Sequence, residues 1–457
     1  MSLNITAVVL AGVLVLLMQG GFALLVTGLC RARNAAQVIS MNLVLFPLSV
    51  LGFWVCGFAL LSGGGSTPDG EWSISLFGHP FGLMGHRGFF LSGVGGDPAA
   101  LCLFFFQAAV VAIAALIPAG VMAERWRFAS VVPYGLWSAA LPVALFGNWV
   151  WGGGWLAQLG QNLGMGHGFV DFAGSSVIHM AGGVAGLMGA TALGPRLGKY
   201  TRDGRPRPMP GHNLTCVIFG TLLLTAGWFG FTIGPSLLNA PARAPLIAVN
   251  TLLACAAGAA AAYMVVTMKF RKPDPSMICN GLLAGLVAIS GPCAFVNSAG
   301  AAIIGAVAGV LVVYSVLFLE GTMKVDDPVG AVSVHGVGGA WGVLSLGLLA
   351  DGSYGAGWNG VHDAGKNGVE TGVTGLFGTL FGAPSNDGSQ LVAQLVGAAA
   401  CLIFAGLSAW AWFKVSGWIT PLRSRHEDEM AGLDLPEMGA ECYPDFHLTD
   451  KGSSPRD

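Results

Sequence analysis

The sequence predicts an all-α membrane protein with eleven transmembrane helices. Of its 457 residues, 54% are hydrophobic and only 10% are charged, and the mean hydropathy is +0.69. Soluble domains usually carry about 25% charged residues. In addition, apolar runs of about 18–25 residues, long enough to cross a bilayer, recur along the chain. Composition and run length therefore both argue against a soluble globular fold.

We expect the spans in a regular order along the chain. The first run has no basic segment before it and is too long for the apolar part of a signal peptide, so it predicts a span and not a cleaved leader. Pro and Gly interrupt the fourth and eighth runs, and the other runs are more continuous. The expected spans are 5–29, 38–62, 99–121, 129–150, 171–194, 213–235, 244–268, 276–294, 298–320, 328–350 and 389–417.

Basic residues assign the loops to two sides of the membrane. If the loop with Arg31 and Arg33 is cytoplasmic, 18 of the 21 Lys and Arg residues lie on that side, and only Arg87, Arg243 and Lys366 lie outside. Cytoplasmic loops carry this excess of positive charge. The sequence therefore predicts an outer N-terminus, a cytoplasmic C-terminus and a place in the cell (inner) membrane.

Two regions are expected, a membrane domain over residues 1–417 and a cytoplasmic tail over 418–457. The tail is charged and, at about 40 residues, too short for an appended enzyme or signalling domain. The outer loops, 63–98, 151–170 and 351–388, are rich in Gly, Ser, Asn and Trp. The first of them either caps a vestibule or is a plain connector.

Several classes of function are not supported. The net charge is −2, and Lys and Arg form no patch with interleaved aromatic residues, so we expect no nucleic-acid partner. The nine Cys are scattered without metal-ligand spacing, which is typical of small buried hydrophobic residues. We therefore expect no metal, no other cofactor and no enzymatic activity.

Two histidines, His179 and His335, lie in apolar stretches that repeat each other. Each has a Gly five residues before it, Gly174 or Gly330, and further Gly three, four and seven residues after it. A titratable ring inside a membrane span is costly, which makes it a candidate functional residue. Equivalent residues in two half-chains predict one site at the interface of a repeat. The pattern is typical of a channel or transporter.

These twin histidines suggest a polar track through an apolar pore. Two neutral imidazoles can share one proton, each offering a donor on one side and an acceptor on the other. The alternative is that each ring is a buried structural His bonded to a carbonyl. A metal site is not expected, because no Cys, Asp or Glu recurs at helical spacing from either His.

Four further residues have both a structural and a functional interpretation. Asp171 opens the fifth span, where it either only caps the helix or also supplies a negative charge that favours a cation. Trp151 precedes three glycines, 152–154, and is either a membrane anchor or a cation–π face. Phe106 and Phe231 either pack the core or form a hydrophobic constriction.

Five short motifs together resemble the ammonium transporter/methylammonium permease/Rhesus family. The resemblance extends from about Gln19 to Phe446 and implies a homotrimer of eleven-span subunits with a five-plus-five inverted repeat and one pore per subunit. The motifs are Ala123-Glu-Arg-Trp-Arg-Phe128, Val150-Trp-Gly-Gly-Gly154, Asp171-Phe-Ala-Gly174 with His179, Gly227-Trp-Phe-Gly-Phe231, and Lys324-Val-Asp-Asp-Pro328 with His335.

The resemblance also implies roles for these residues. NH4+ would be recruited outside against Trp151, with Asp171 as the structural and electrostatic support. Phe106 and Phe231 would be gate and lining aromatics, with Phe106 also bordering the recruitment site. NH4+ would lose its proton at the gate, and NH3 would pass the twin histidines. K+ has no proton to give up and would have to cross desolvated, which explains selectivity.

The sequence departs from the family pattern at three positions. Where the family commonly has a second gate Phe, this chain has Val110. Where the family commonly has a Ser that bonds the recruited cation, it has Pro235, and Ser236 lies one residue on. Gly330 replaces an acidic residue often found before the second pore His. These changes would broaden the pore, weaken recruitment or abolish conduction.

Three functions are therefore open. The leading one is transport of ammonium and methylammonium. The second is passage of another small amine or a neutral gas, which Val110 and Pro235 suggest, and the third is a non-conducting ammonium sensor. The resemblance also suggests a PII-type regulatory protein at the cytoplasmic face, for which the basic loop 196–207 and the tail segment 423–429 are candidate surfaces.

Overall fold

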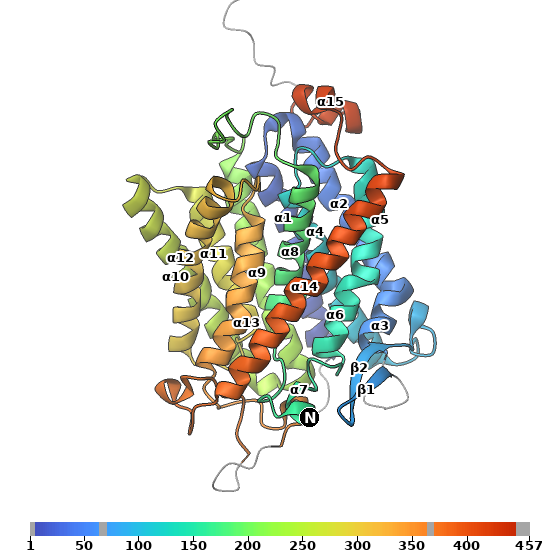
Figure 1. Ribbon diagram of the computed structural model, residues 1–457, viewed down its shortest axis with the longest axis vertical. Helices are drawn as coiled ribbons and strands as arrows, with labels where there is room; N and C mark the ends of the chain where they lie inside the picture. Colours follow the sequence, from blue (N-terminus) through green and yellow to red (C-terminus); the bar gives the residue numbers. More distant parts are fainter. Residues whose placement is uncertain (1–4, 64–70, 363–369, 445–457) are drawn as a thin grey trace, which may run out of the picture.

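The structure, a computed structural model, describes residues 5–63, 71–362 and 370–444. It is a bundle of long apolar helices (Figure 1), as predicted. Within the described residues, 10 helical segments are long and apolar enough to cross a membrane. The expected span at 276–294 is the shorter apolar helix α11 (Pro275–Ser290), of 16 residues. The predicted all-α membrane fold is confirmed.

The helices fall into two halves followed by a last helix that crosses the bundle obliquely (Figure 1). The first half consists of α1 (Ile5–Leu29), α2 (Ala35–Gly52), α3 (Phe58–Ser62), α4 (Pro98–Val121), α5 (Phe128–Ala140), α6 (Pro142–Trp151) and α8 (Ala181–Leu193). The second half consists of α9 (Leu214–Asn239), α10 (Ala244–Phe270), α11, α12 (Ser298–Gly321) and α13 (Gly338–Leu349), and the last helix is α14 (Gly388–Ile419). Single π-helical turns join α2 to α3 and precede α8 and α13, at Phe53–Gly57, Ser175–Met180 and Val332–Val337.

Helix contacts repeat between the halves. In the first half α2 packs on α4 and α5, and in the second α10 packs on α11 and α12. Likewise α4 contacts α8, and α11 contacts α13. Because each half has five spans, the two halves cross the membrane in opposite senses, which is the predicted inverted repeat.

The halves join along α1 and α9, where glycines bring the backbones together. A Cβ on Gly21 of α1 would lie 2.9 Å from the carbonyl oxygen of Gly220, and one on Gly227 of α9 would lie 2.7 Å from that of Leu14. Small residues permit this close approach between helices that have no hydrophobic driving force in lipid.

The fourth expected span is broken in the middle. Leu141 separates α5 from α6 with φ −123° and ψ −76°, and Pro142 follows it. Proline has no N–H to continue the helical ladder and its ring clashes with the preceding turn. The break therefore follows from a single residue.

The loop at 63–98, which the sequence predicts to be outer, contains an antiparallel hairpin of β1 (Glu71–Leu76) and β2 (His79–Gly85). Trp149 Nε1 donates to the carbonyl of Leu83 at 2.8 Å, and Gln158 Oε1 accepts the N–H of Gly82 at 2.9 Å. The hairpin is thereby attached to the last turn of α6 and to the residue before the short helix α7 (Leu159–Leu163). Residues 64–70 of this loop lie outside the described part.

The tail packs on the end of the bundle opposite the hairpin (Figure 1). It contains α15 (His426–Ala431) and a π-helical turn, Asp434–Met438. Glu429 accepts the N–H of Leu197 at 2.8 Å and pairs with Arg423 at 2.8 Å. Asp434 accepts the N–H of Gln37 at 3.0 Å. The helix before the tail ends at Ile419, two residues beyond the expected boundary.

The same end holds a buried cluster of charges, the inner ion network. Arg196 donates from Nε to Asp326 Oδ2 at 2.9 Å and also pairs with Glu124 at 3.3 Å. Arg31 pairs with the other side of Glu124. Arg125 Nη2 donates to the carbonyl of Asp326 at 2.7 Å. Asp326 belongs to the second half, Arg31, Glu124 and Arg125 belong to the first, and Arg196 lies in the segment that joins them, so the network ties the halves together.

Candidate functional site

The twin histidines both lie in π-helical turns. His179 lies in Ser175–Met180 and His335 in Val332–Val337. Each turn follows a left-handed glycine, Gly174 with φ +109° and Gly330 with φ +75°. Non-glycine residues rarely adopt this backbone conformation, so the repeated Gly five residues before each His has a structural reason. Such π-helical turns are frequent at functional sites.

The two rings meet in the middle of the bundle. Nδ1 of His335 lies 3.1 Å from Nδ1 of His179, and the rings stack at 5.1 Å between centroids with 21° between planes. His179 is fully buried and His335 is 3% exposed. At this distance one Nδ1 must donate and the other accept, so a neutral pair shares one proton between its facing nitrogens.

Aromatic rings surround the pair. Trp228 of α9 stacks on His179 at 4.9 Å, and Phe231 lies 5.3 Å from the same ring. Phe22 of α1 lies 5.7 Å from His335. Within the described chain, Nε2 of His179 has no hydrogen-bond partner. A polar nitrogen therefore faces an apolar environment, where it can accept a proton from, or donate one to, a passing small molecule.

A cavity adjoins His335 on the side of the inner ion network. Its walls are apolar except for Asn280, whose Nδ2 donates to the carbonyl of Val329 at 3.1 Å. Gly330 borders this wall, because a Cβ there would lie 2.7 Å from the Asn280 nitrogen. A larger residue at 330 would meet this amide as well as an unfavourable φ. The replacement of the acidic residue by Gly330 thus fits the local backbone.

Asp171 organises the first π-helical turn. Its Oδ1 accepts the N–H groups of Gly174 and Ser175, both at 2.9 Å. Its Oδ2 accepts the N–H and hydroxyl of Ser176 at 2.7 and 2.6 Å and the N–H of Val177 at 3.1 Å. The side chain is 2% exposed. The carboxylate therefore satisfies donors that a helix start leaves unpaired, and its charge lies at the positive end of the helix dipole.

Asp327 does the same for the second turn, and the sequence interpretation missed it. Its Oδ1 accepts the N–H groups of Val329 and Gly330 at 3.2 and 3.0 Å, and its Oδ2 accepts that of Val332 at 2.7 Å. The signal was present: Asp327 precedes His335 by eight residues, as Asp171 precedes His179. The repeat therefore includes the capping acids.

Trp151 is joined directly to this cap. Its Nε1 donates to the carbonyl of Asp171 at 2.7 Å, and the far edge of its indole would lie 3.3 Å from a Cβ on Gly174. The ring is half-buried. The indole thus lies at the N-terminal end of the first π-helical turn.

Phe106 and Val110 lie one helical turn apart on α4, and both are buried. The Phe106 ring edge occupies the space where Gly234 of α9 has no side chain. Phe106 therefore packs beside Pro235, while Phe231, one turn earlier on α9, contacts His179. The structure thus places Phe106 of α4 against α9 at Gly234 and Phe231 of α9 against His179.

Ser236 and Pro235 are both inside α9. The Ser236 hydroxyl donates to the carbonyl of Ile233 at 2.7 Å, and the side chain is fully buried. Pro235 supplies no donor. In this arrangement neither residue directs a free hydrogen-bond donor toward Phe106.

The chain is similar to known membrane proteins over nearly its whole length. The model of the Ammonium Transporter Family matches residues 6–443. Ammonium transporter Amt2 of Archaeoglobus fulgidus is 40% identical over 443 residues, which cover 96% of this chain and 88% of the relative. Ammonium transporter Amt1 of Haloferax mediterranei is 32% identical over 459 residues, which cover 97% of this chain and 80% of the relative.

Solved structures of ammonium transport proteins have a similar fold. One described as a sensor Amt protein has a TM-score of 0.81 and 30% identity, covering 95% of this chain and 98% of that one. Saccharomyces cerevisiae Mep2 has a TM-score of 0.76 at 23% identity, covering 92% and 89%, and this likeness concerns the fold. The chain therefore belongs to the ammonium transporter family, a family of multi-pass membrane transport proteins and not of enzymes.

Proposed function

We propose that this chain moves ammonium and methylammonium across a membrane as the deprotonated base. NH4+ is held at the outer end against the Trp151 indole, near the negative charge of Asp171. It loses its proton where Phe106, Val110 and Phe231 narrow the path. NH3 then passes the twin histidines toward the cavity beside Asn280. Membership of the family supports the ammonium substrate.

The observation that carries this proposal is the 3.1 Å contact between the Nδ1 atoms of the twin histidines inside an apolar environment. A buried pair that shares a proton offers NH3 a hydrogen-bonding partner without a fixed charge. A hydrated cation finds no such compensation, because burying an unpaired charge costs far more than burying a neutral polar molecule. The same geometry allows the released proton to follow by the histidines.

We expect His179→Ala to lower the saturable ammonium current at least about tenfold, because the remaining His335 would have no partner with which to share a proton. One hydrogen bond to a charged group is worth about 1.5–3 kcal/mol, which corresponds to a factor of ten or more. The measurement is current on a solid-supported membrane carrying proteoliposomes, with pulses of ammonium, methylammonium, trimethylammonium and K+.

The matched control for this experiment is His362→Ala, which removes an exposed histidine paired with Glu370 in an outer loop. It should leave the current unchanged. An ammonium current of normal size in folded His179→Ala protein would contradict the role of the histidine pair.

A second candidate function, passage of a larger amine or a neutral gas, is favoured by Val110 and Pro235. A valine removes aromatic bulk one turn from Phe106, and the proline removes a donor for a recruited cation. Passage of a neutral gas would give substrate-dependent flux without current in the same vesicles.

We expect Val110→Phe to lower the methylammonium current relative to the ammonium current about tenfold, since one methyl group in a tight apolar site is worth about 1–3 kcal/mol. The control is Leu101→Phe, at a side chain of the same helix that is 39% exposed. Equal loss of both currents would show that position 110 does not select by size.

The third candidate, a non-conducting sensor, is motivated by the 30% identity to the sensor Amt protein. Binding of ammonium without current or flux in wild-type vesicles would support it. If wild-type protein neither bound ammonium nor gave an ammonium current, but gave a current with trimethylammonium, the larger-amine function would be supported instead.

The remaining features of the proposal concern assembly and placement. We place the membrane domain at residues 1–417 and the cytoplasmic tail at 418–457, with the N-terminus outside in the cell (inner) membrane. We also propose a homotrimer with one pore per subunit, as the resemblance to the family implies. A PII-type partner would bind the basic loop 196–207 and the tail segment 423–429, which the Leu197–Glu429 contact brings together. A pull-down at low and high ATP tests this partner.

A further inference from the structure

The last helix, α14, presents one stripe of small and polar side chains to the chain around Asp171. The stripe repeats every three or four residues, so its members share one face of the helix. All of them are buried, and they are Gln390, Gln394, Gly397 and Cys401. A single side of α14 can therefore follow the segment that leads into the π-helical turn of His179.

Residues 167–170 belong to no helix or strand, so their buried backbone groups need partners from elsewhere in the chain. Gln390 supplies two of these partners. Its Oε1 accepts the N–H of His167 at 2.8 Å, and its Nε2 donates to the carbonyl of Gly168 at 2.9 Å. The side chain of Gln390 is fully buried. One amide therefore pairs with this backbone as a neighbouring strand would.

Gln394 lies one turn further along α14 and is also fully buried. Its Oε1 accepts the N–H of Val170 at 2.9 Å, and its Nε2 donates to the carbonyl of the same residue at 2.8 Å. Nε2 also donates to the carbonyl of Val343, in α13, at 2.9 Å. Val170 directly precedes Asp171, and α13 follows the π-helical turn of His335. Gln394 therefore joins the residue before the first capping acid to the second pore helix.

The other two members of the stripe extend this contact along the chain. A Cβ on Gly397 would lie 2.0 Å from the ring of Phe169, so this ring occupies the place of a side chain there. One turn further on, Sγ of Cys401 lies 3.7 Å from the carbonyl oxygen of Ser176, inside the first π-helical turn. The stripe thus contacts the chain at intervals from residue 167 to residue 176.

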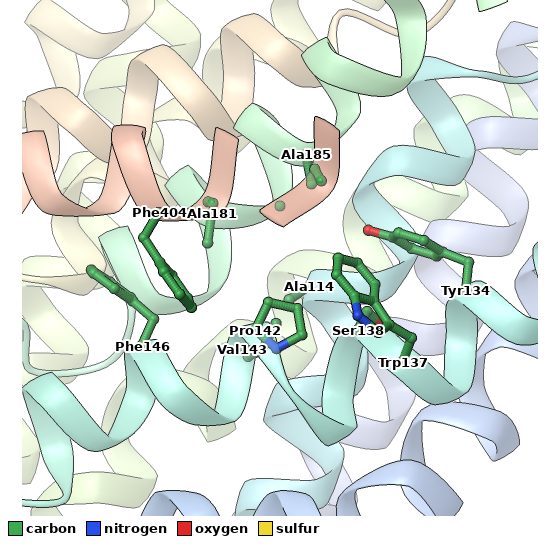
Figure 2. Close-up of a pocket in the computed structure, with 13 residues that line it drawn as sticks. Ala114, Tyr134, Trp137, Ser138, Pro142, Val143, Phe146, Ala181, Ala185 and Phe404 are labelled. Atoms are coloured by element: carbon green, nitrogen blue, oxygen red, sulfur yellow. The ribbon is translucent and has the colours of Figure 1, made fainter. Parts of the chain in front are cut away.

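The same helix supports α6, which carries Trp151. Phe404 follows the stripe by about one turn and lies beside Phe146 (Figure 2), with 6.5 Å between the ring centroids. It lies closer to Trp149, two residues before Trp151, with 4.6 Å between centroids. Helix α14 therefore contacts both elements that form the proposed recruitment site.

The residue before each capping acid is held by a buried side chain from elsewhere in the chain. In the second half Arg125 donates to the carbonyl of Asp326 at 2.7 Å, and in the first half Gln394 donates to that of Val170. The two anchors differ in charge. A guanidinium at the outer end would repel an arriving cation, whereas an amide supplies both a donor and an acceptor without adding a charge.

We infer that Gln394 is a positioning residue for the outer cation site and that its neutral amide, supported by Gln390, sets the affinity of that site. The inference rests on the proposed recruitment of NH4+ at this place. Gln394 acts through Val170, the neighbour of Asp171, and thereby through the Asp171 carbonyl to which Trp151 donates.

The chain after Asp171 has supports of its own. The N–H groups of Phe172 and Ala173 donate to carbonyl groups at the end of α11, those of Gly291 and Ser290, at 3.1 and 3.0 Å. Loss of the Gln394 amide should therefore disturb the recruitment site more than the histidine pair, and so change affinity more than the maximal rate.

The first test measures ammonium current against concentration in proteoliposomes that contain Gln394→Met. Methionine keeps the length of the side chain but donates no hydrogen bond. We expect the half-saturation concentration to rise about tenfold, because the competent arrangement of the site becomes a minor one. Saturating ammonium restores that arrangement, so the maximal current should stay within about twofold of the wild type. A purely structural defect would instead lower the maximal current at an unchanged half-saturation concentration.

Hydrogen exchange of the purified protein, mapped by mass spectrometry, provides a readout that needs no transport. The Val170 amide should exchange at least about tenfold faster in Gln394→Met, since its acceptor is gone. Ser416→Ala is the matched control. It removes a buried hydroxyl of the same helix that donates to the carbonyl of Trp412 at 2.6 Å, and it should leave both readouts unchanged.

Gln390→Met is the second variant, because it leaves the contacts of Gln394 in place. It should raise the half-saturation concentration by less, about threefold. The inference is overturned if folded Gln394→Met has the wild-type half-saturation concentration, if only its maximal current falls, or if Val170 exchanges as in the wild type. Should Gln394→Met fail to fold, a wild-type half-saturation concentration in Gln390→Met would overturn it.

Failure of the proposed function gives a different result. If the wild type carries no ammonium current, the proposed function fails, whereas exchange at Val170 still decides whether Gln394 holds the segment before Asp171.

Discussion

Replacement of Asp171 by alanine should reduce ammonium transport about a hundredfold, the effect expected when a site is displaced by about 1 Å. The carboxylate accepts four backbone N–H groups and one hydroxyl at the start of the π-helical turn. Each buried N–H left without a partner costs about 1–3 kcal/mol. The turn would rearrange, and with it His179 and the carbonyl to which Trp151 donates.

Two further variants separate this role from helix capping in general. Asp171→Asn keeps the side-chain shape but can no longer accept at one of its two atoms, so its current should be intermediate. Asp97→Ala removes an exposed cap at the start of α4, where Oδ1 accepts the N–H of Ala99 at 2.9 Å, and should leave transport unchanged. Normal current in folded Asp171→Ala protein would refute the proposed dependence of the pore on this cap.

Replacement of Asp326 by alanine should lower stability by about 3–5 kcal/mol, the cost of removing one partner from a buried ion pair. Asp326 and Arg196 are 2% and 3% exposed, and Arg196 donates to the carboxylate through Nε, Nη2 and its backbone N–H, at 2.8–2.9 Å. Without Asp326, Arg196 would remain beside Arg125 with only Glu124 to pair with. The melting temperature in detergent, followed by tryptophan fluorescence, measures the loss.

The exposed pair Asp203–Arg205 provides the control, because surface pairs contribute about 0–1 kcal/mol. Asp203→Ala should therefore leave the melting temperature nearly unchanged. If Asp326→Ala melted within the error of the wild type, the inner ion network would not hold the two halves together.

The ionisation of Asp326 predicts that the stability of the protein decreases in acid. Burial by itself raises the pKa of Asp326, but the hydrogen bonds and charge of Arg196, together with the charge of Arg125, outweigh it and lower the pKa to about 2. Because an unfolded Asp has a pKa of about 3.9, the ionised group contributes about 2 kcal/mol of stability above pH 4, which is lost as the pH falls toward 2. The difference in melting temperature between wild type and Asp326→Ala should shrink over that range. A difference that stayed constant from pH 5 to 2 would contradict this assignment.

The two pore histidines lie on equivalent turns of the two halves. Asp171 and Asp327 cap equivalent π-helical turns, and the halves cross the membrane in opposite senses. Each His therefore enters the middle of the bundle from an opposite end, on a turn fixed by one left-handed Gly and one Asp. This arrangement explains why the two Nδ1 atoms can face each other.

Much of this site could be predicted from local signals. The equal spacing of Gly174 from His179 and of Gly330 from His335 already identified the pair. A left-handed backbone position favours Gly, and a titratable ring in an apolar span stands out in the sequence, so both features can be recognised without a structure. Asp327 could have been found from the same spacing. The stacking of Trp228 on His179 could not, because 49 residues separate them and nothing in either segment specifies which helix faces it.

The sequence by itself determined the membrane class, the position of the spans and the repeated histidine segments, because these depend on the hydropathy, length and backbone preference of contiguous residues. Only the tertiary structure decided that the two Nδ1 atoms meet, that Ser236 bonds its own helix, and that the tail packs against Leu197 and Gln37. These features depend on how helices far apart in the chain pack together, and apolar spans of similar composition contain little information about their neighbours.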